Sequence, residues 1–174
     1  MICLLVYMLV MLAIAFALKR KPIGLQILIE GITLLISMIA ASILLYQNPF
    51  TKPKTFPTAL IFLAIPVLGL GEEVYIPIDK LFVISAAALL PAAEEILFRW
   101  CLLKEFGVLV SALIFSLIHL TNVFSKMEKF SVEVLYARFL LGAVLGEIAQ
   151  QSGSIIPPII FHSAINLFAI IKSK

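Results

Sequence analysis

The stretch LFVISAAALLPAAEEILFRWCLL, from Leu81 to Leu103, decides the fold of this chain. It is apolar and long enough to cross a bilayer, for which a helix needs about 20 residues. It nevertheless carries two adjacent carboxylates, Glu94 and Glu95, and the guanidinium of Arg99. An ionisable group at that depth costs at least roughly 2 to 3 kcal/mol unless it is paired or hydrated. The stretch therefore predicts a membrane helix whose charged residues are candidates for a functional site.

The composition extends this prediction to the whole chain. Its 174 residues are 63% hydrophobic and 13% charged, with a mean hydropathy of +1.16, far from an ordinary soluble domain. The apolar runs are continuous rather than alternating, which favours helices over a closed barrel. We therefore expect an all-α integral membrane protein, with residues 1–174 forming one polytopic domain.

Seven apolar runs bounded by charge, Pro or Gly are predicted to span the membrane. The third is the weakest, because it is short and contains Pro66. The runs are Ile2–Leu18, Ile23–Tyr46, Thr58–Leu70, Leu81–Leu103, Phe106–Phe124, Val134–Ala149 and Ser154–Ile171. The expected architecture is a transmembrane helix bundle of about seven spans.

The basic residues predict orientation rather than a nucleic-acid surface, because the net charge of +3 is small and scattered near span ends. We expect no nucleic-acid partner. One side collects Lys19, Arg20, Lys21, Lys80, Lys126, Lys129, Lys172 and Lys174, and the other Lys52, Lys54 and Lys104. The positive-inside rule then puts the N-terminus outside and the C-terminus in the cytoplasm of a multi-pass protein of the plasma membrane. The first run has no basic residue before it, so it is expected to be a span rather than a cleaved signal.

Helical spacing separates the two glutamates of the EEILFR segment. Glu95 and Arg99 are four residues apart, so they share a helix face and are predicted to pair, either as a packing device or as part of the chemistry. Glu94 has no partner on its own helix and can act as a general base or a metal ligand. The paired glutamates of Gly71–Glu73 lack such an arginine and are expected in a solvated loop.

Two later segments carry the only histidines of the chain, His119 and His162. In FSLIH, Phe115 lies one turn before His119, a pattern that suits either packing or function. In HSAIN, His162 and Asn166 lie four residues apart, so their donors can point together at a developing oxyanion. The alternative for this second pair is an ordinary interhelical hydrogen bond.

The remaining features of the spans concern packing. GAVLG, from Gly142 to Gly146, is a small-xxx-small pattern that lets helices approach closely. Arg138 and Glu147 lie nine residues apart on the same run, too far to pair with each other, and Arg138 is the better candidate for a substrate contact. Cys3 and Cys101 have no paired spacing and are expected to be buried, inert thiols.

Together these residues predict hydrolysis of a carbonyl substrate in a membrane-embedded cavity. One glutamate and two histidines match the ligand count of catalytic zinc sites. The same groups suit a metal-free hydrolase in which Glu94 and His119 activate water while His162 and Asn166 stabilise an oxyanion. The cofactor is therefore left open between zinc, another divalent metal and none.

The three segments EEILFR, FSLIH and HSAIN resemble, in this order, the motifs EExxxR, FxxxH and HxxxN of the CPBP family, also called Abi. That family includes type II CAAX prenyl endopeptidases and bacteriocin-processing or bacteriocin-immunity proteins. The similarity continues through GAVLGEIAQQSGSIIPPIIFHSAIN and covers about Leu81 to Lys174, so residues 81–174 are the expected catalytic core.

The resemblance implies an all-α membrane fold with a cavity and a glutamate-dependent endopeptidase. Position by position, it implies that Glu94 is the water-activating base and His119 its partner. It further implies that His162 and Asn166 stabilise the oxyanion or contribute to a metal site.

Glu95 and Arg99 would then hold the site in shape, which agrees with their spacing. No HExxH occurs, so the zincin pattern is absent. The expected partners are membrane lipid and a membrane-associated peptide or protein, such as a CAAX-type prenylated C-terminus or a bacteriocin or leader peptide.

Three other functions compete with an intramembrane endopeptidase. A bacteriocin self-immunity protein would act by binding, without required proteolysis. A haem-binding electron carrier would use His119 and His162 as axial ligands but leaves EEILFR unexplained. A transporter would use the carboxylates of the spans as a proton path.

Overall fold

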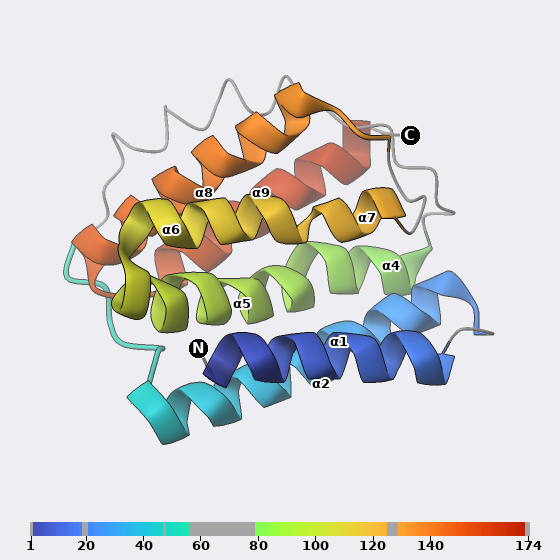
Figure 1. The fold of residues 1–174 in the computed structure, drawn as a ribbon, viewed down its shortest axis with the longest axis horizontal. Coiled ribbons are helices and arrows are strands. Elements are labelled where there is room, and N and C mark those ends of the chain that lie inside the picture. The colour runs from blue at the N-terminus through green and yellow to red at the C-terminus, as the bar shows by residue number, and fades with distance from the viewer. Residues whose placement is uncertain (1, 19–20, 47, 56–78, 125–128, 173–174) are drawn as a thin grey trace.

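The described residues of the computed structural model, 2–18, 21–46, 48–55, 79–124 and 129–172, form helices and connecting segments, without a strand among them (Figure 1). The all-α prediction is therefore confirmed. The third predicted span, Thr58–Leu70, and the predicted loop Gly71–Glu73 lie outside these residues. The count of seven spans and the orientation derived from it accordingly stay predictions.

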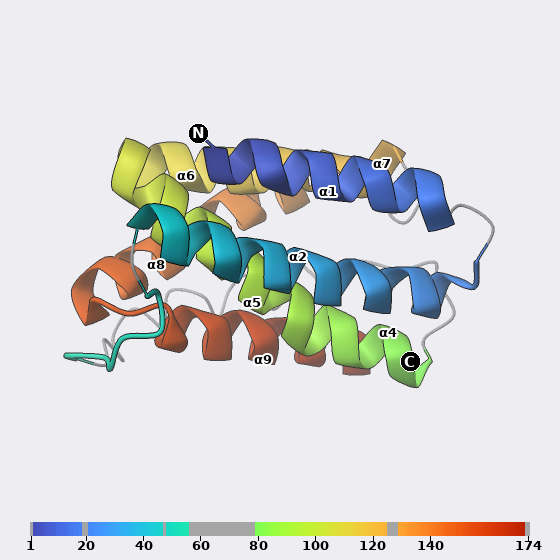
Figure 2. The same cartoon turned by 90° about the horizontal axis from the view of Figure 1, so that it is seen from below.

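The chain begins with two helices, α1 (Ile2–Leu18) and α2 (Ile23–Tyr46), whose bounds agree with the first two predicted spans. They pack against each other as a hairpin (Figure 2). Pro22 directly precedes α2, in keeping with the preference of proline for positions around a helix start.

The predicted span Leu81–Leu103 forms one continuous central helix that contains two wide turns. Asp79 caps its start, its carboxylate accepting from the Phe82 N–H at 2.7 Å. Its consecutive segments are α4 (Lys80–Ile84), the π-helical η1 (Ser85–Leu89), α5 (Leu90–Glu95) and the π-helical η2 (Ile96–Leu102). Pro91 lacks an N–H and would crowd the preceding α-turn, and the wider η1 turn in front of it relieves that conflict.

The chain then turns back at Gly107, where the backbone leaves helical geometry with φ 78°. This is a conformation that favours glycine. This break agrees with the predicted start of a span at Phe106. It lies within the helix α6 (Leu103–Ile118), which is followed by the short α7 (Leu120–Phe124) rather than continuing to Phe124 as one helix.

The C-terminal part consists of two long helices, α8 (Val132–Ser152) and α9 (Ile156–Lys172). Ser131 caps α8 by accepting from the Val134 N–H at 3.1 Å, and Gly153 ends it in the left-handed conformation. The predicted close approach forms here: a Cβ on Gly142 would lie 3.1 Å from the Ala112 Cα of α6.

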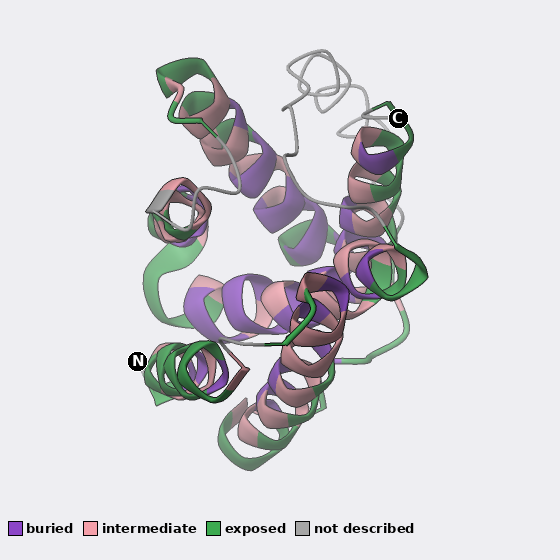
Figure 3. Cartoon of the chain, turned by 90° about the vertical axis from the view of Figure 1, so that its right-hand side faces the viewer, coloured by how far each residue is buried: buried purple, intermediate pink, exposed green. Residues whose placement is uncertain are grey.

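The central helix is the hub of the bundle, because α1, α2, α6, α8 and α9 all pack against parts of it (Figures 1 and 2). Its α5 and η2 segments supply half of the main buried cluster, which Cys3 and Tyr7 join from α1 and Leu34 and Met38 from α2. Figure 3 shows buried residues facing the middle of the bundle and exposed ones facing outward.

The outward face is strongly apolar. Phe16 is 88% exposed, Leu44 83% and Leu12 69%. A surface of this kind suits lipid rather than water. Two helical stretches are long and apolar enough to cross a membrane, Ile23–Tyr46 and Lys80–Val123, the second of which contains the break at Gly107. Ile2–Leu18 and Ile156–Lys172 are shorter apolar helices.

Candidate active site

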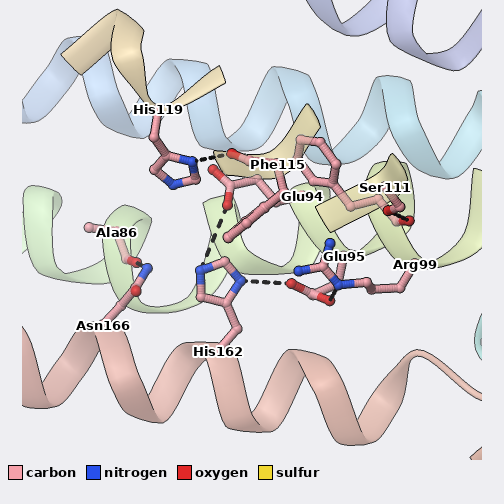
Figure 4. Close-up of polar contacts among 10 residues, drawn as sticks. Ala86, Glu94, Glu95, Arg99, Ser111, Phe115, His119, His162 and Asn166 are labelled. Carbon is pink, nitrogen blue, oxygen red and sulfur yellow. Dashed lines mark hydrogen bonds and ion pairs between the residues drawn. The ribbon is translucent and has the colours of Figure 1, made fainter. Parts of the chain in front are cut away.

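The three sequence motifs meet where the central helix, the end of α6 and α9 come together (Figure 4). Glu94 and Glu95 are the last residues of α5, and Arg99 follows in η2. His119 stands directly after α6, and His162 comes from α9. Figure 4 shows both imidazoles pointing toward the Glu94 carboxylate.

Glu95 is the centre of a buried polar chain. Its Oε2 lies 3.0 Å from Arg99 Nε, and its Oε1 accepts from His162 Nδ1–H at 2.8 Å. The Arg99 contact is ionic rather than a well-aligned hydrogen bond, because none of the three guanidinium nitrogens makes a hydrogen bond of good geometry. The predicted pair of Glu95 and Arg99 is confirmed, and His162 joins it from a helix far along the chain.

Glu94 and Glu95 differ in how they are held and in what can reach them. The Glu95 side chain is 0% exposed, whereas that of Glu94 is 14% exposed. Glu94 Oε2 lies 3.7 Å from His162 Nε2, close enough for an ion pair but too far for a hydrogen bond. His162 therefore stands between a sealed carboxylate and an accessible one.

Phe115 packs against Arg99 and against both histidines of the site. Its ring lies edge-on to His119 at 4.7 Å and to His162 at 5.7 Å between ring centres. The Arg99 guanidinium carbon lies 4.6 Å from the same ring centre, which is a cation–π contact. The sequence placed Phe115 beside His119, but its contacts with α9 and the central helix were not foreseen.

The tautomer of His119 follows from its partner. Its Nδ1 lies 2.7 Å from the Phe115 carbonyl oxygen. Because a carbonyl oxygen only accepts, Nδ1 carries the proton, and in the neutral ring Nε2 carries the lone pair. The hydrogen bond also fixes the plane of the ring at the end of α6.

Asn166 ties α9 to the central helix. Its Nδ2 donates to the Ala86 carbonyl at 2.9 Å. This bond uses one of the two amide N–H groups, which leaves the other for a further acceptor. The interhelical hydrogen bond that was the alternative interpretation of this segment is therefore present, and the joint orientation of His162 and Asn166 toward an oxyanion stays a prediction.

The described residues do not assemble a metal site. Among them, no group of three or more His, Cys, Asp or Glu side chains is arranged to hold a metal ion. Whether Glu94 and the two histidines hold a metal therefore stays an open prediction.

The N-terminal hairpin contributes two polar groups that spacing alone did not place at the site. Tyr7 of α1 is 3% exposed, and Glu30 of α2 is half-buried. Both are close enough to Glu94 to interact with it electrostatically. Glu30 is a carboxylate inside the predicted span Ile23–Tyr46, which is a signal that the sequence carries, whereas nothing in the sequence singles out Tyr7.

Comparison with known proteins adds one finding. The sequence model of the family described as type II CAAX prenyl endopeptidase Rce1-like matches residues 77–168, just over half of the chain. This range includes all three motifs, from Glu94 to Asn166. No match was found among curated proteins or solved structures. The chain therefore belongs to the type II CAAX prenyl endopeptidase Rce1-like family of membrane-embedded proteins.

Proposed function

We propose that this chain is a multi-pass endopeptidase of the plasma membrane that hydrolyses a peptide bond near the prenylated C-terminus of a CAAX-type substrate, with Glu94 as the water-activating base. One observation carries the proposal. Of two adjacent buried glutamates, Glu95 is sealed and doubly engaged, while Glu94 is 14% exposed and can meet water and substrate. Family membership supports the class of reaction.

In the proposed reaction, Glu94 takes a proton from a water molecule while the water oxygen attacks the carbonyl carbon of the scissile bond. His119 helps to orient that water through Nε2, since its Nδ1–H is committed to the Phe115 carbonyl. The C–N bond then breaks, and the proton held by Glu94 passes to the leaving amine. Water is thereby divided between the new carboxylate and the new amine.

The negative charge on the tetrahedral oxygen needs donors. The imidazolium form of His162 is one candidate, because it carries an N–H at Nε2 in addition to the Nδ1–H that donates to Glu95. The second amide N–H of Asn166 is the other candidate. Arg99 contributes indirectly, because it holds Glu95 and so fixes the orientation of His162.

The test uses the purified chain in lipid nanodiscs and a farnesylated peptide that ends in a C-a-a-X sequence. Cleavage is followed by mass spectrometry in heavy-oxygen water, which labels the new carboxylate. Glu94→Gln should lower kcat/KM by roughly 10²- to 10⁴-fold, the usual contribution of a general base.

Glu147→Gln is the matched control, because it makes the same change in a glutamate of α8 that is not part of the site. It should cleave at the wild-type rate. Full activity of Glu94→Gln, or no cleavage by the wild-type protein, would count against the assignment.

A further inference from the structure

Arg138 is a cation at the depth of the spans that the proposed reaction does not use. The chain has three arginines, of which Arg99 is 1% exposed and enclosed by its own partners. Arg138 lies within α8 and is only half-buried. An arginine in such a position is energetically costly unless it is paired or hydrated, and it is by default a candidate for a functional site.

The contacts between α6 and α8 fix the level of Arg138 along the bundle. A Cβ on Gly146 would meet Val108, and one on Gly142 would meet Phe115, so the two helices run antiparallel. Further along, the Ser116 hydroxyl donates to the Leu135 carbonyl at 2.6 Å. Arg138 lies between Leu135 and Gly142, so it is level with the last turn of α6, which His119 directly follows.

The helix face on which Arg138 lies follows from the neighbours of α8. Leu141, Leu145 and Ile148 form the side of α8 that packs against Phe161 and Ile165 of α9. The residues that touch α6 lie on the adjacent side of the helix.

At 100° per residue, Arg138 falls between these two sides. Its side chain therefore starts on the part of the α8 surface between α6 and α9. His119 directly follows α6, and α9 carries His162. Consistent with this position, its charge acts electrostatically on Glu94.

The chemistry of a CAAX-type substrate supplies an acceptor for this cation. Its modified cysteine is fourth from the end, so a cut on the C-terminal side of that cysteine frees at most three residues, with the terminal α-carboxylate. Three extended residues span about 10 Å, the distance between neighbouring packed helices. A carboxylate brought to this depth needs a counter-charge, and a guanidinium can bind it through two parallel hydrogen bonds.

We infer that Arg138 binds the terminal α-carboxylate of the substrate and thereby sets a short, fixed distance between the scissile bond and the chain end. This inference rests on the proposed function. Arg138 is already engaged within the chain, so the substrate carboxylate exchanges with an existing contact. Arg138 is a specificity-determining residue in this account, and Glu94 remains the base.

The test compares two farnesylated peptides of identical sequence, one with a free C-terminal carboxylate and one with a C-terminal amide. The wild-type protein should cleave the acid with a kcat/KM roughly 10- to 100-fold above that of the amide, mainly through KM, as expected for a charge-assisted contact. Arg138→Gln should lower cleavage of the acid to the level of the amide, so that the ratio of the two kcat/KM values falls to about one. Arg138→Lys should retain part of the preference.

The outcomes separate the inference from the function on which it rests. If the wild-type protein cleaves neither peptide, the proposed function fails. If it cleaves both equally, or if Arg138→Gln keeps the preference for the acid, the inference fails and the endopeptidase stands. Loss of amide cleavage in a folded Arg138→Gln protein would also overturn it, because Arg138 would then act on the site as a whole. Should Arg138→Gln not insert, Arg138→Lys provides the same comparison, and an undiminished preference contradicts the inference.

Discussion

The two adjacent glutamates are expected to respond in opposite ways to the same substitution. Glu95→Gln removes the charge that faces Arg99 while keeping the size of the side chain. The side chains of Glu95 and Arg99 are both 0% exposed, and among the described residues the guanidinium finds no partner for a well-aligned hydrogen bond. Removing one partner of a buried ion pair typically costs about 3 to 5 kcal/mol, because the other charge stays buried without compensation.

For a chain of this size, 1 kcal/mol shifts the thermal midpoint by about 2 to 4 °C, so Glu95→Gln should melt roughly 6 to 20 °C below the wild-type protein. Glu94→Gln should stay within about 2 °C of it and lose cleavage instead. The double variant Glu95→Gln/Arg99→Met should recover most of the loss, since both charges are then absent.

The assay is the thermal midpoint measured by intrinsic fluorescence in one detergent at one heating rate, because membrane proteins often unfold irreversibly. Equal midpoints for Glu95→Gln and the wild-type protein would refute the structural role of the pair. A double variant less stable than the single one would refute the electrostatic reason for it.

Two further predictions concern the packing that positions the site. Gly142→Ala places a methyl group 3.1 Å from the α6 backbone and should cost about 1 to 3 kcal/mol of stability, seen as a fall of several degrees in the same melting assay. Gly146→Ala meets a movable side chain instead and should cost less. Equal effects of the two substitutions would contradict the close backbone approach of the two helices at Gly142. The thiols of Cys3 and Cys101 are in contact, so a membrane-permeant oxidant should join them in an intramolecular disulfide. Mass spectrometry should show the loss of two hydrogens in the wild-type protein and no such loss in Cys3→Ser. Absence of the disulfide in the wild-type protein would argue against the packing of α1 on η2.

The helices were predictable to the extent that their ends carry local signals. The bounds of α1 and α2 follow from a polar, proline-containing connection between two apolar runs. The break at Gly107 lies next to the predicted boundary between the spans Leu81–Leu103 and Phe106–Phe124, but the sequence did not single out this glycine as the point where the backbone turns. The wide turns of the central helix were also missed, since the periodicity assumed 3.6 residues per turn, although Pro91 was a visible warning.

For the site, residue spacing predicted contacts between side chains of one helix but few contacts between helices. The pair of Glu95 and Arg99 follows from four residues of separation. The bond from His162 to Glu95 joins residues 67 positions apart, and only the packing of α9 on the central helix brings them together. The same holds for Asn166 and Ala86, which are 80 positions apart. The catalytic roles of these residues stay predictions.

The lengths of α1 and α9 have a consequence for the surrounding lipid. Each has 17 residues, about 26 Å at 1.5 Å per residue, whereas the hydrocarbon core of a typical bilayer is about 30 Å thick. A bilayer relieves such a mismatch by thinning around the protein. Because α9 brings His162 to Glu94, thinning at this helix would bring the aqueous boundary nearer to Glu94, the proposed base. We therefore expect the acyl-chain length of the neighbouring lipids to set how far water must travel to reach Glu94.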